Sequence, residues 1–164
     1  MAVQGRPLRQ GDLALVRAAK RALERGFDRE RHTVAAAVRT RSGMVYLGLN
    51  LNGIHTPCAE PVAMGAAVTR GDREMEVMVA VKRKGKRYRV LSPCGTCRQL
   101  LFDYSPNASV IVRFRNGRVA RLTVGESLPA AYATFDDKRT VPRTPRQGRG
   151  DAEPARGRRH SVHG

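Results

Sequence analysis

The chain of 164 residues is poor in several residue types, and each shortage counts against a class of protein. It has no tryptophan and only four tyrosines and four phenylalanines, which are few for a surface that stacks single-stranded bases. No stretch approaches the roughly twenty apolar residues that span a bilayer. The first twelve residues lack the apolar core of a signal peptide. We therefore expect a cytoplasmic protein with no membrane association, whose thiols stay reduced.

Acidic residues are also scarce. The chain has 14 Asp and Glu against 31 Lys and Arg, and its formal net charge is +17. Such a surface binds phosphate backbones through counterion release, so a nucleic-acid-directed protein is one hypothesis. The competing interpretation is that the charge reflects the coding sequence and not a binding function. Arginine greatly outnumbers lysine, as it does in proteins from coding sequences rich in guanine and cytosine. Because the chain has few aromatic residues for stacking on bases, we keep nucleic acid as the alternative partner and not as the leading one.

The composition divides the chain in two near residue 135. Residues 136–164 hold almost no large apolar side chain and accumulate arginine, glycine and proline, so they bury too little surface to offset the entropy cost of ordering. We predict one folded domain over residues 1–135 and a basic, disordered tail over residues 136–164.

Apolar periodicity in the folded part alternates between helix and strand spacing. Helical patterns cover residues 13–23, 58–68 and 94–104, and strand patterns cover 34–38, 44–49, 76–81, 110–114 and 118–122. These elements predict an α/β fold, with helices on the faces of a five-stranded mixed sheet. The basic run over residues 82–89 lies between a strand and a loop. We interpret it as a solvated loop, with a substrate or subunit contact as the alternative.

The three cysteines are the most informative residues. Cys58 is followed by Glu60, and Cys94 and Cys97 form a Cys-x-x-Cys pair later in the chain. That pair alone also fits a redox motif or a structural zinc ribbon. The added Cys-x-Glu element, without a fourth Cys or His at ribbon spacing, favours a catalytic zinc with three protein ligands and one open position. His55 is the alternative fourth ligand, which would close the site.

Both cysteine segments open predicted helices, and helix N-termini help to keep thiols ionised. Arg98, beside Cys97, is a candidate for further balancing charge, and an ordinary exposed helix residue is the alternative. Glu60 lies too close to Cys58 in the chain for easy ligation of the same ion. It can instead take a proton from the attacking water and pass protons to a ring nitrogen and to the leaving ammonia.

Longer runs surround these residues. They read His-Thr-Val-Ala-Ala-Ala at 32–37, Gly-Leu-Asn at 48–50, Pro-Cys-Ala-Glu at 57–60, Leu-Ser-Pro-Cys-Gly-Thr-Cys-Arg-Gln-Leu-Leu at 91–101 and Glu-Ser-Leu-Pro-Ala-Ala-Tyr at 126–132. With these runs the chain resembles the cytidine deaminase superfamily over roughly residues 10–135. The Pro-Cys-Gly-x-Cys-Arg-Gln run is highly specific, and the Leu-Pro-x-x-Tyr ending is most similar to the blasticidin S deaminase branch.

The resemblance implies a three-layer α/β/α sandwich and a homotetramer whose active sites borrow residues from neighbouring subunits. It implies that Zn²⁺ is the cofactor, held by Cys58, Cys94 and Cys97, and that Glu60 is the catalytic proton shuttle.

The resemblance also assigns substrate contacts. Thr33, Asn50 and Tyr132 occupy positions that contact substrate in relatives. An arginine ahead of the second cysteine motif is expected to bind substrate as well, and Arg87 and Arg89 compete for that role because the basic insertion blurs the register.

Two departures from the pattern bear on the substrate. The family pattern has a glutamate that binds ribose at the position of Asn52. It often has an arginine at the position of Pro61. We therefore expect a zinc-dependent hydrolytic deaminase of a free cytosine-type nucleoside, a nucleoside antibiotic such as blasticidin S, or a related aminated heterocycle. The alternatives are a nucleic-acid-directed base deaminase or binder, and a zinc-stabilised binding protein without catalysis.

Overall fold

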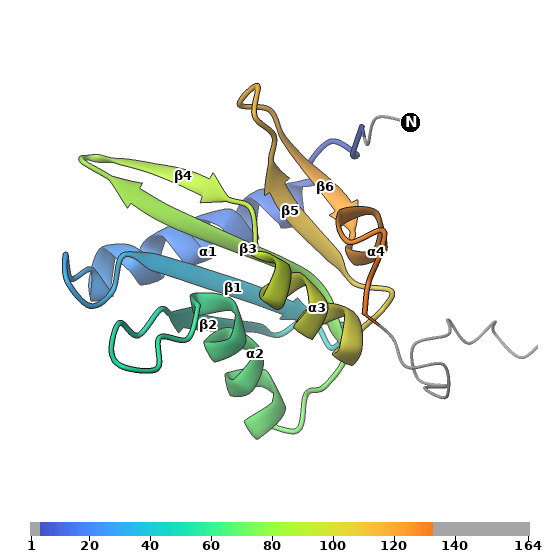
Figure 1. Ribbon diagram of the computed structural model, residues 1–164, viewed down its shortest axis with the longest axis horizontal. Helices are drawn as coiled ribbons and strands as arrows, with labels where there is room; N and C mark the ends of the chain where they lie inside the picture. Colours follow the sequence, from blue (N-terminus) through green and yellow to red (C-terminus); the bar gives the residue numbers. More distant parts are fainter. Residues whose placement is uncertain (1–3, 133–164) are drawn as a thin grey trace, which may run out of the picture.

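A mixed sheet of six strands carries helices on both faces in the computed structural model, which describes residues 4–132 (Figure 1). The strands are β1 (Val34–Thr40), β2 (Val45–Leu49), β3 (Met75–Lys84), β4 (Arg87–Leu91), β5 (Ser109–Arg113) and β6 (Val119–Thr123). The helices are α1 (Gln10–Gly26), α2 (Ala59–Thr69), α3 (Gly95–Tyr104) and the single turn α4 (Val124–Ser127). The predicted tail over 136–164 lies outside the described residues and stays a prediction.

The strand order is β2-β1-β3-β5-β6, and β4 pairs with β3 beside this path. β3 and β5 are parallel, whereas every other pair of strands is antiparallel. Parallel neighbours need a crossover connection. The chain makes this crossover through β4 and α3, so α3 begins directly after the β3–β4 hairpin.

Alternate residues of the central strands pack into two separate cores, one on each face of the sheet. On one face α1 covers a cluster that includes Leu15, Leu23, Ala35, Ala37, Val77, Val79 and Ile111. On the other face α2 and α3 cover a cluster that includes Ala36, Val38, Ala63, Met78, Ala80, Leu101 and Val110. The expected three-layer α/β/α sandwich is therefore confirmed. No helix within residues 4–132 is both long enough and apolar enough to cross a membrane.

A glycine in β2 sets how closely α2 approaches the sheet. A Cβ atom on Gly48 would lie 2.4 Å from the backbone nitrogen of Ala63 and 2.5 Å from the carbonyl oxygen of Ala59. Real side chains do not reach such distances, so only glycine admits the backbone of α2 here. The first turn of α2, with Cys58 at its N-cap, is thereby held against the sheet.

The expected count of five strands is wrong, because the basic run forms a hairpin rather than a solvated loop. β3 continues to Lys84, turns at Gly85 with φ of 60°, and pairs with β4 from Arg87 onward. Only Tyr88 and Val90 of β4 pack on the α1 side, while the alternate residues are exposed. Two apolar side chains among so many charges were too weak a signal for a strand.

Candidate active site

The three cysteines meet at the N-termini of α2 and α3. Cys58 is the N-cap of α2, Cys94 is the N-cap of α3, and Cys97 lies in the first turn of α3. Their sulfur atoms all lie within 4.8 Å of one another, and those of Cys94 and Cys97 are 3.4 Å apart. Residues from two distant parts of the sequence thus form a group that can hold one metal ion. Cys58 and Cys94 are exposed, which leaves the site open on one side.

The chemistry of this donor set fits a zinc ion. Burial, followed by the nearby charge of Glu60, raises the pKa of the Cys97 thiol, and burial also raises the pKa of Cys58. Burial raises the pKa of Cys94 too, but hydrogen bonds outweigh it, chiefly one from the backbone N–H of Cys97, so that this pKa is lowered. Three thiols within 4.8 Å of one another ionise together only beside a positive charge, and a zinc ion supplies it.

Glu60 lies on the first turn of α2, beside the cysteine cluster. It is buried, with only 3% of its surface exposed. Burial raises the pKa of its carboxyl group, and hydrogen bonds from its own backbone N–H and from the Cys97 thiol act in the opposite direction. A raised pKa brings the charged and the neutral form of the carboxyl group closer in free energy near neutral pH. Such a group is suited to accept and return a proton.

Arg98 and His55 are the two other residues that the sequence predicts near the metal-binding cysteines. Arg98 donates hydrogen bonds to the carbonyl oxygens of Cys94 and Ser127, so its guanidinium group contacts backbone rather than the thiols and links α3 to α4. Among residues 4–132 the metal-binding group contains the three cysteines and no histidine. His55 is exposed in the loop before α2, and the structure does not bring it into this group.

Asn50 and Asn52 form a network that the sequence did not reveal. The side-chain oxygen of Asn50 accepts hydrogen bonds from the backbone N–H groups of Thr33 and Val34, both at 2.8 Å. Its amide nitrogen donates to the side-chain oxygen of Asn52 at 2.8 Å, and Asn52 donates to the Glu30 carbonyl at 2.7 Å. The two amides fix the start of β1 against the end of β2. The Asn-x-Asn spacing, which places alternate residues on one side of an extended segment, was the available signal.

Tyr132 lies at the end of the described chain, beside α3. Its ring is largely solvent-facing, with 75% of the residue exposed. Its backbone is bound on both sides by Gln99, whose amide nitrogen donates to the Tyr132 carbonyl at 2.9 Å and whose oxygen accepts from the Tyr132 N–H at 2.8 Å. Sequence reasoning gave Gln99 no role, although it belongs to the specific Pro-Cys-Gly-x-Cys-Arg-Gln run.

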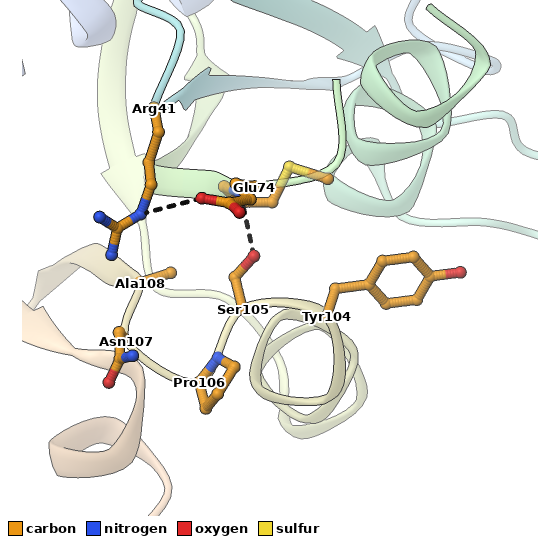
Figure 2. A pocket seen from close by; sticks show the side chains of 8 residues that line it. Arg41, Glu74, Tyr104, Ser105, Pro106, Asn107 and Ala108 are labelled. Atoms are coloured by element: carbon orange, nitrogen blue, oxygen red, sulfur yellow. Dashed lines mark hydrogen bonds and ion pairs between the residues drawn. The ribbon is translucent and has the colours of Figure 1, made fainter. Parts of the chain in front are cut away.

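A separate hollow lies at the other end of α3 (Figure 2). It has a volume of about 220 Å³ and is lined by residues around Tyr104 and Ser105. The side chains of Arg41, Glu74 and Ser105 in this hollow already have partners. Arg41 pairs with Glu74 at 3.5 Å, and the Ser105 hydroxyl accepts a hydrogen bond from the Met75 N–H at 2.9 Å. The hollow contains neither a thiol nor a buried acid, so the cysteine cluster remains the candidate active site.

Comparison with known proteins agrees with this chemistry. Residues 9–113 match the family model described as the cytidine and deoxycytidylate deaminase zinc-binding region. A blasticidin-S deaminase of Bacillus cereus is 34% identical over 131 residues, which cover 75% of this chain and 93% of that protein. A cytidine deaminase of Halalkalibacterium halodurans is 34% identical over 110 residues, covering 65% of this chain and 81% of the relative.

Solved structures show the same fold. The cytidine deaminase of Burkholderia pseudomallei is 29% identical with a TM-score of 0.61, and the match covers 76% of this chain and 100% of that one. The cytidine deaminase of Mycobacterium tuberculosis is 26% identical with a TM-score of 0.61, covering 74% and 97%. The fold and the site therefore define a zinc-dependent deaminase, a hydrolase. The chain belongs to the cytidine and deoxycytidylate deaminase family.

Proposed function

We propose that this chain hydrolytically deaminates a free cytosine-type nucleoside, a nucleoside antibiotic of the blasticidin S kind, or a related aminated heterocycle. In this proposal Cys58, Cys94 and Cys97 hold the zinc ion and Glu60 moves the protons. The proposal rests on one arrangement. Three thiols lie within 4.8 Å of one another, and the neighbouring carboxyl group of Glu60 is only 3% exposed.

Zinc held by three thiolates supplies a Lewis-acid centre that makes water nucleophilic near neutral pH. Glu60 accepts a proton from the attacking water and delivers it to the ring nitrogen beside the reacting carbon. The carbon–oxygen bond forms in this step. Glu60 then carries the second proton to the amino group, the carbon–nitrogen bond breaks, and ammonia leaves. One water is consumed for each ammonia released, and Glu60 returns to its starting state.

The buried position of Glu60 supports this role. A carboxylate that is nearly free of solvent exchanges protons with the substrate rather than with bulk water. The side chain also starts on a helix packed closely against β2 through Gly48, so its position is fixed by backbone packing. A fixed acid–base group contributes typically 10²–10⁴-fold to a rate.

The choice of substrate rests on the relatives and on Asn52. The relatives include deaminases of blasticidin S and of cytidine. The amide of Asn52 is engaged on both sides, by Asn50 and by the Glu30 carbonyl. A neutral amide that already has its partners binds a sugar hydroxyl less strongly than a free carboxylate does. This supports a substrate other than plain cytidine as the preferred one.

We further propose that Thr33, Asn50 and Tyr132 lie at the substrate pocket, with Asn50, whose own amide is already bonded, holding Thr33 in place through the Thr33 N–H. We also propose that the active assembly is a homotetramer. Because Tyr132 is 75% exposed on a single chain, its ring is free to contact a neighbouring subunit. A dependence of activity on protein concentration, followed together with the sedimentation coefficient, tests the assembly.

The test of the function is ammonia release from a substrate panel by the zinc-loaded protein. The panel contains cytidine, deoxycytidine, cytosine, blasticidin S and guanine. We expect activity on at least one of the cytosine-bearing compounds, with blasticidin S favoured over cytidine. Zinc-loaded protein that is inert on all five compounds would contradict the proposal.

A further inference from the structure

The β3–β4 hairpin presents four cations on one face. Lys82 lies directly opposite Arg89, and Lys84 lies directly opposite Arg87. All four side chains are exposed, and they alternate with residues that point to the other face. Successive pairs are two residues apart along each strand, which is roughly 7 Å. We call these four residues the basic face.

The opposite side of the hairpin is packed on α1, which fixes the direction of the basic face. Tyr88 lies partly buried against the α1 core, with the Lys20 ammonium 5.1 Å from its ring centre. The Arg83 guanidinium lies 4.2 Å from the ring centre of Phe27, just after α1. These contacts leave the four cations on the side of the sheet that carries α2 and α3. In Figure 1 the hairpin extends beyond both of these helices.

The two pairs of facing cations lower the stability of the hairpin, and no ion pair in the described fold offsets this. Like charges directly opposite each other on neighbouring strands destabilise the pair. Within residues 4–132 none of the four takes part in an ion pair with an acidic side chain. Four concentrated positive charges without a partner in the described fold are what an anionic ligand would neutralise.

The shape of the surface decides which anion fits. A small phosphate-bearing ligand is normally held in a concave site that buries most of it. The basic face is instead an open, exposed strand surface, which holds one small anion weakly. A polyanion gains from every contact, because each neutralised phosphate releases counterions. The one aromatic residue of the hairpin, Tyr88, packs on the opposite face, so no base-stacking side chain lies among the four cations and binding would follow the phosphate backbone and not the sequence.

We propose that the basic face binds the phosphodiester backbone of nucleic acid without sequence preference, a property beyond deamination of a free substrate. The face lies next to the candidate active site. Lys82 pairs with Val34, the residue after Thr33, and β4 ends at Leu91, three residues before Cys94.

The experiment measures binding of the full chain to a fluorescent single-stranded RNA and to duplex DNA of equal length, by anisotropy at several salt concentrations. Four backbone contacts contribute roughly −2.8 to the slope of log K against log salt for a single strand and roughly −3.6 for a duplex. In the variant Lys82→Gln/Lys84→Gln, which removes one cation from each pair, we expect this slope to weaken by roughly 1.4 for RNA or 1.8 for DNA.

The matched control is Arg17→Gln/Arg21→Gln, which removes the same charge from exposed positions on α1. We expect the control to keep the slope of the unchanged protein. An equal loss in both variants would overturn the proposal, because binding would then follow diffuse charge. No binding to either nucleic acid, or an unchanged slope in the Lys82/Lys84 variant, would overturn it as well. Ammonia release from a free nucleoside is measured beside it, so failure of this proposal is distinct from failure of the deaminase assignment.

Discussion

Gln99 holds the backbone of Tyr132 with both atoms of its side-chain amide, at 2.9 and 2.8 Å. Gln99 lies on α3, two residues after Cys97, so the segment that carries Tyr132 is attached to the helix that carries two of the thiols. The tyrosine ring itself is 75% exposed. Its backbone is therefore fixed while its side chain stays available for contacts.

Replacing Gln99 should weaken substrate binding more than it weakens the fold. Gln99→Leu removes both hydrogen bonds and frees the Tyr132 segment. If Tyr132 contacts substrate, we expect KM to rise by about 5- to 30-fold, since one hydrogen bond contributes about 1 kcal/mol and the two together about 2 kcal/mol. The zinc content should not change. Steady-state kinetics measure the effect, and Tyr132→Ala should reproduce it. A normal KM in both variants would remove Tyr132 from the substrate pocket.

Gly48 should tolerate no side chain. In Gly48→Ala the new Cβ meets backbone atoms of α2 at 2.4 and 2.5 Å, so the helix must move away from the sheet. We expect a loss of at least 1–3 kcal/mol in the free energy of unfolding, together with weaker zinc binding. Chemical denaturation measures the first effect and a competitive zinc indicator the second.

Gly65 supplies the control on the same helix. Nothing lies within 4 Å of a Cβ atom placed there, and the residue is exposed. Gly65→Ala should therefore raise the stability by about 0.5–1 kcal/mol through helix propensity. Equal effects at positions 48 and 65 would show that the close approach of α2 to β2 is not the cause.

The ion pair between Glu76 and Arg39 should make the free energy of unfolding depend on pH in the acidic range. The Arg39 hydrogen bond, at 2.8 Å, lowers the pKa of Glu76 below its unfolded value. A depressed carboxyl pKa stabilises the folded state above the unfolded pKa, and this contribution is lost as the pH falls through the folded pKa. Glu76→Gln should therefore be destabilising at pH 7, with a smaller difference from the unchanged protein at pH 3.

Denaturation of both proteins at the two pH values checks this, because loss of metal at low pH affects both alike. Glu74→Gln is the control, since this glutamate has a side chain that is 77% exposed. It should change stability little at either pH. A difference for Glu76→Gln that is the same at pH 3 and pH 7 would contradict the assignment.

Metal removal should destabilise the protein. The three thiols come from the N-termini of two helices, and a bound ion links these helices in the folded state only. A ligand present at 100 times its dissociation constant adds about 2.7 kcal/mol to stability. We expect a clear fall in Tm with a strong chelator, and recovery on adding Zn²⁺. Cys97→Ser should abolish both the zinc content and the response to the chelator.

The sequence predicted the layers and the metal-binding group because both depend on local patterns. Apolar periodicity identified α1 and the central strands, and the short motifs placed Cys58 and Cys94 at helix starts. β4 was missed because its exposed residues are charged and only Tyr88 and Val90 show strand alternation. The Asn-x-Asn spacing could have indicated that Asn50 and Asn52 act together, but the partners of Asn52 and Gln99 in distant segments, Glu30 and Tyr132, are not visible in any local pattern.

In the proposed mechanism Glu60 moves protons beside a zinc ion held by the three cysteines. Measuring zinc content and ammonia release together in Glu60→Gln tests it most directly, on whichever panel substrate the unchanged protein accepts. We predict one zinc ion per chain, as in the unchanged protein, and a fall in kcat of roughly 10²–10⁴-fold. Full zinc content with kcat close to that of the unchanged protein would contradict the account.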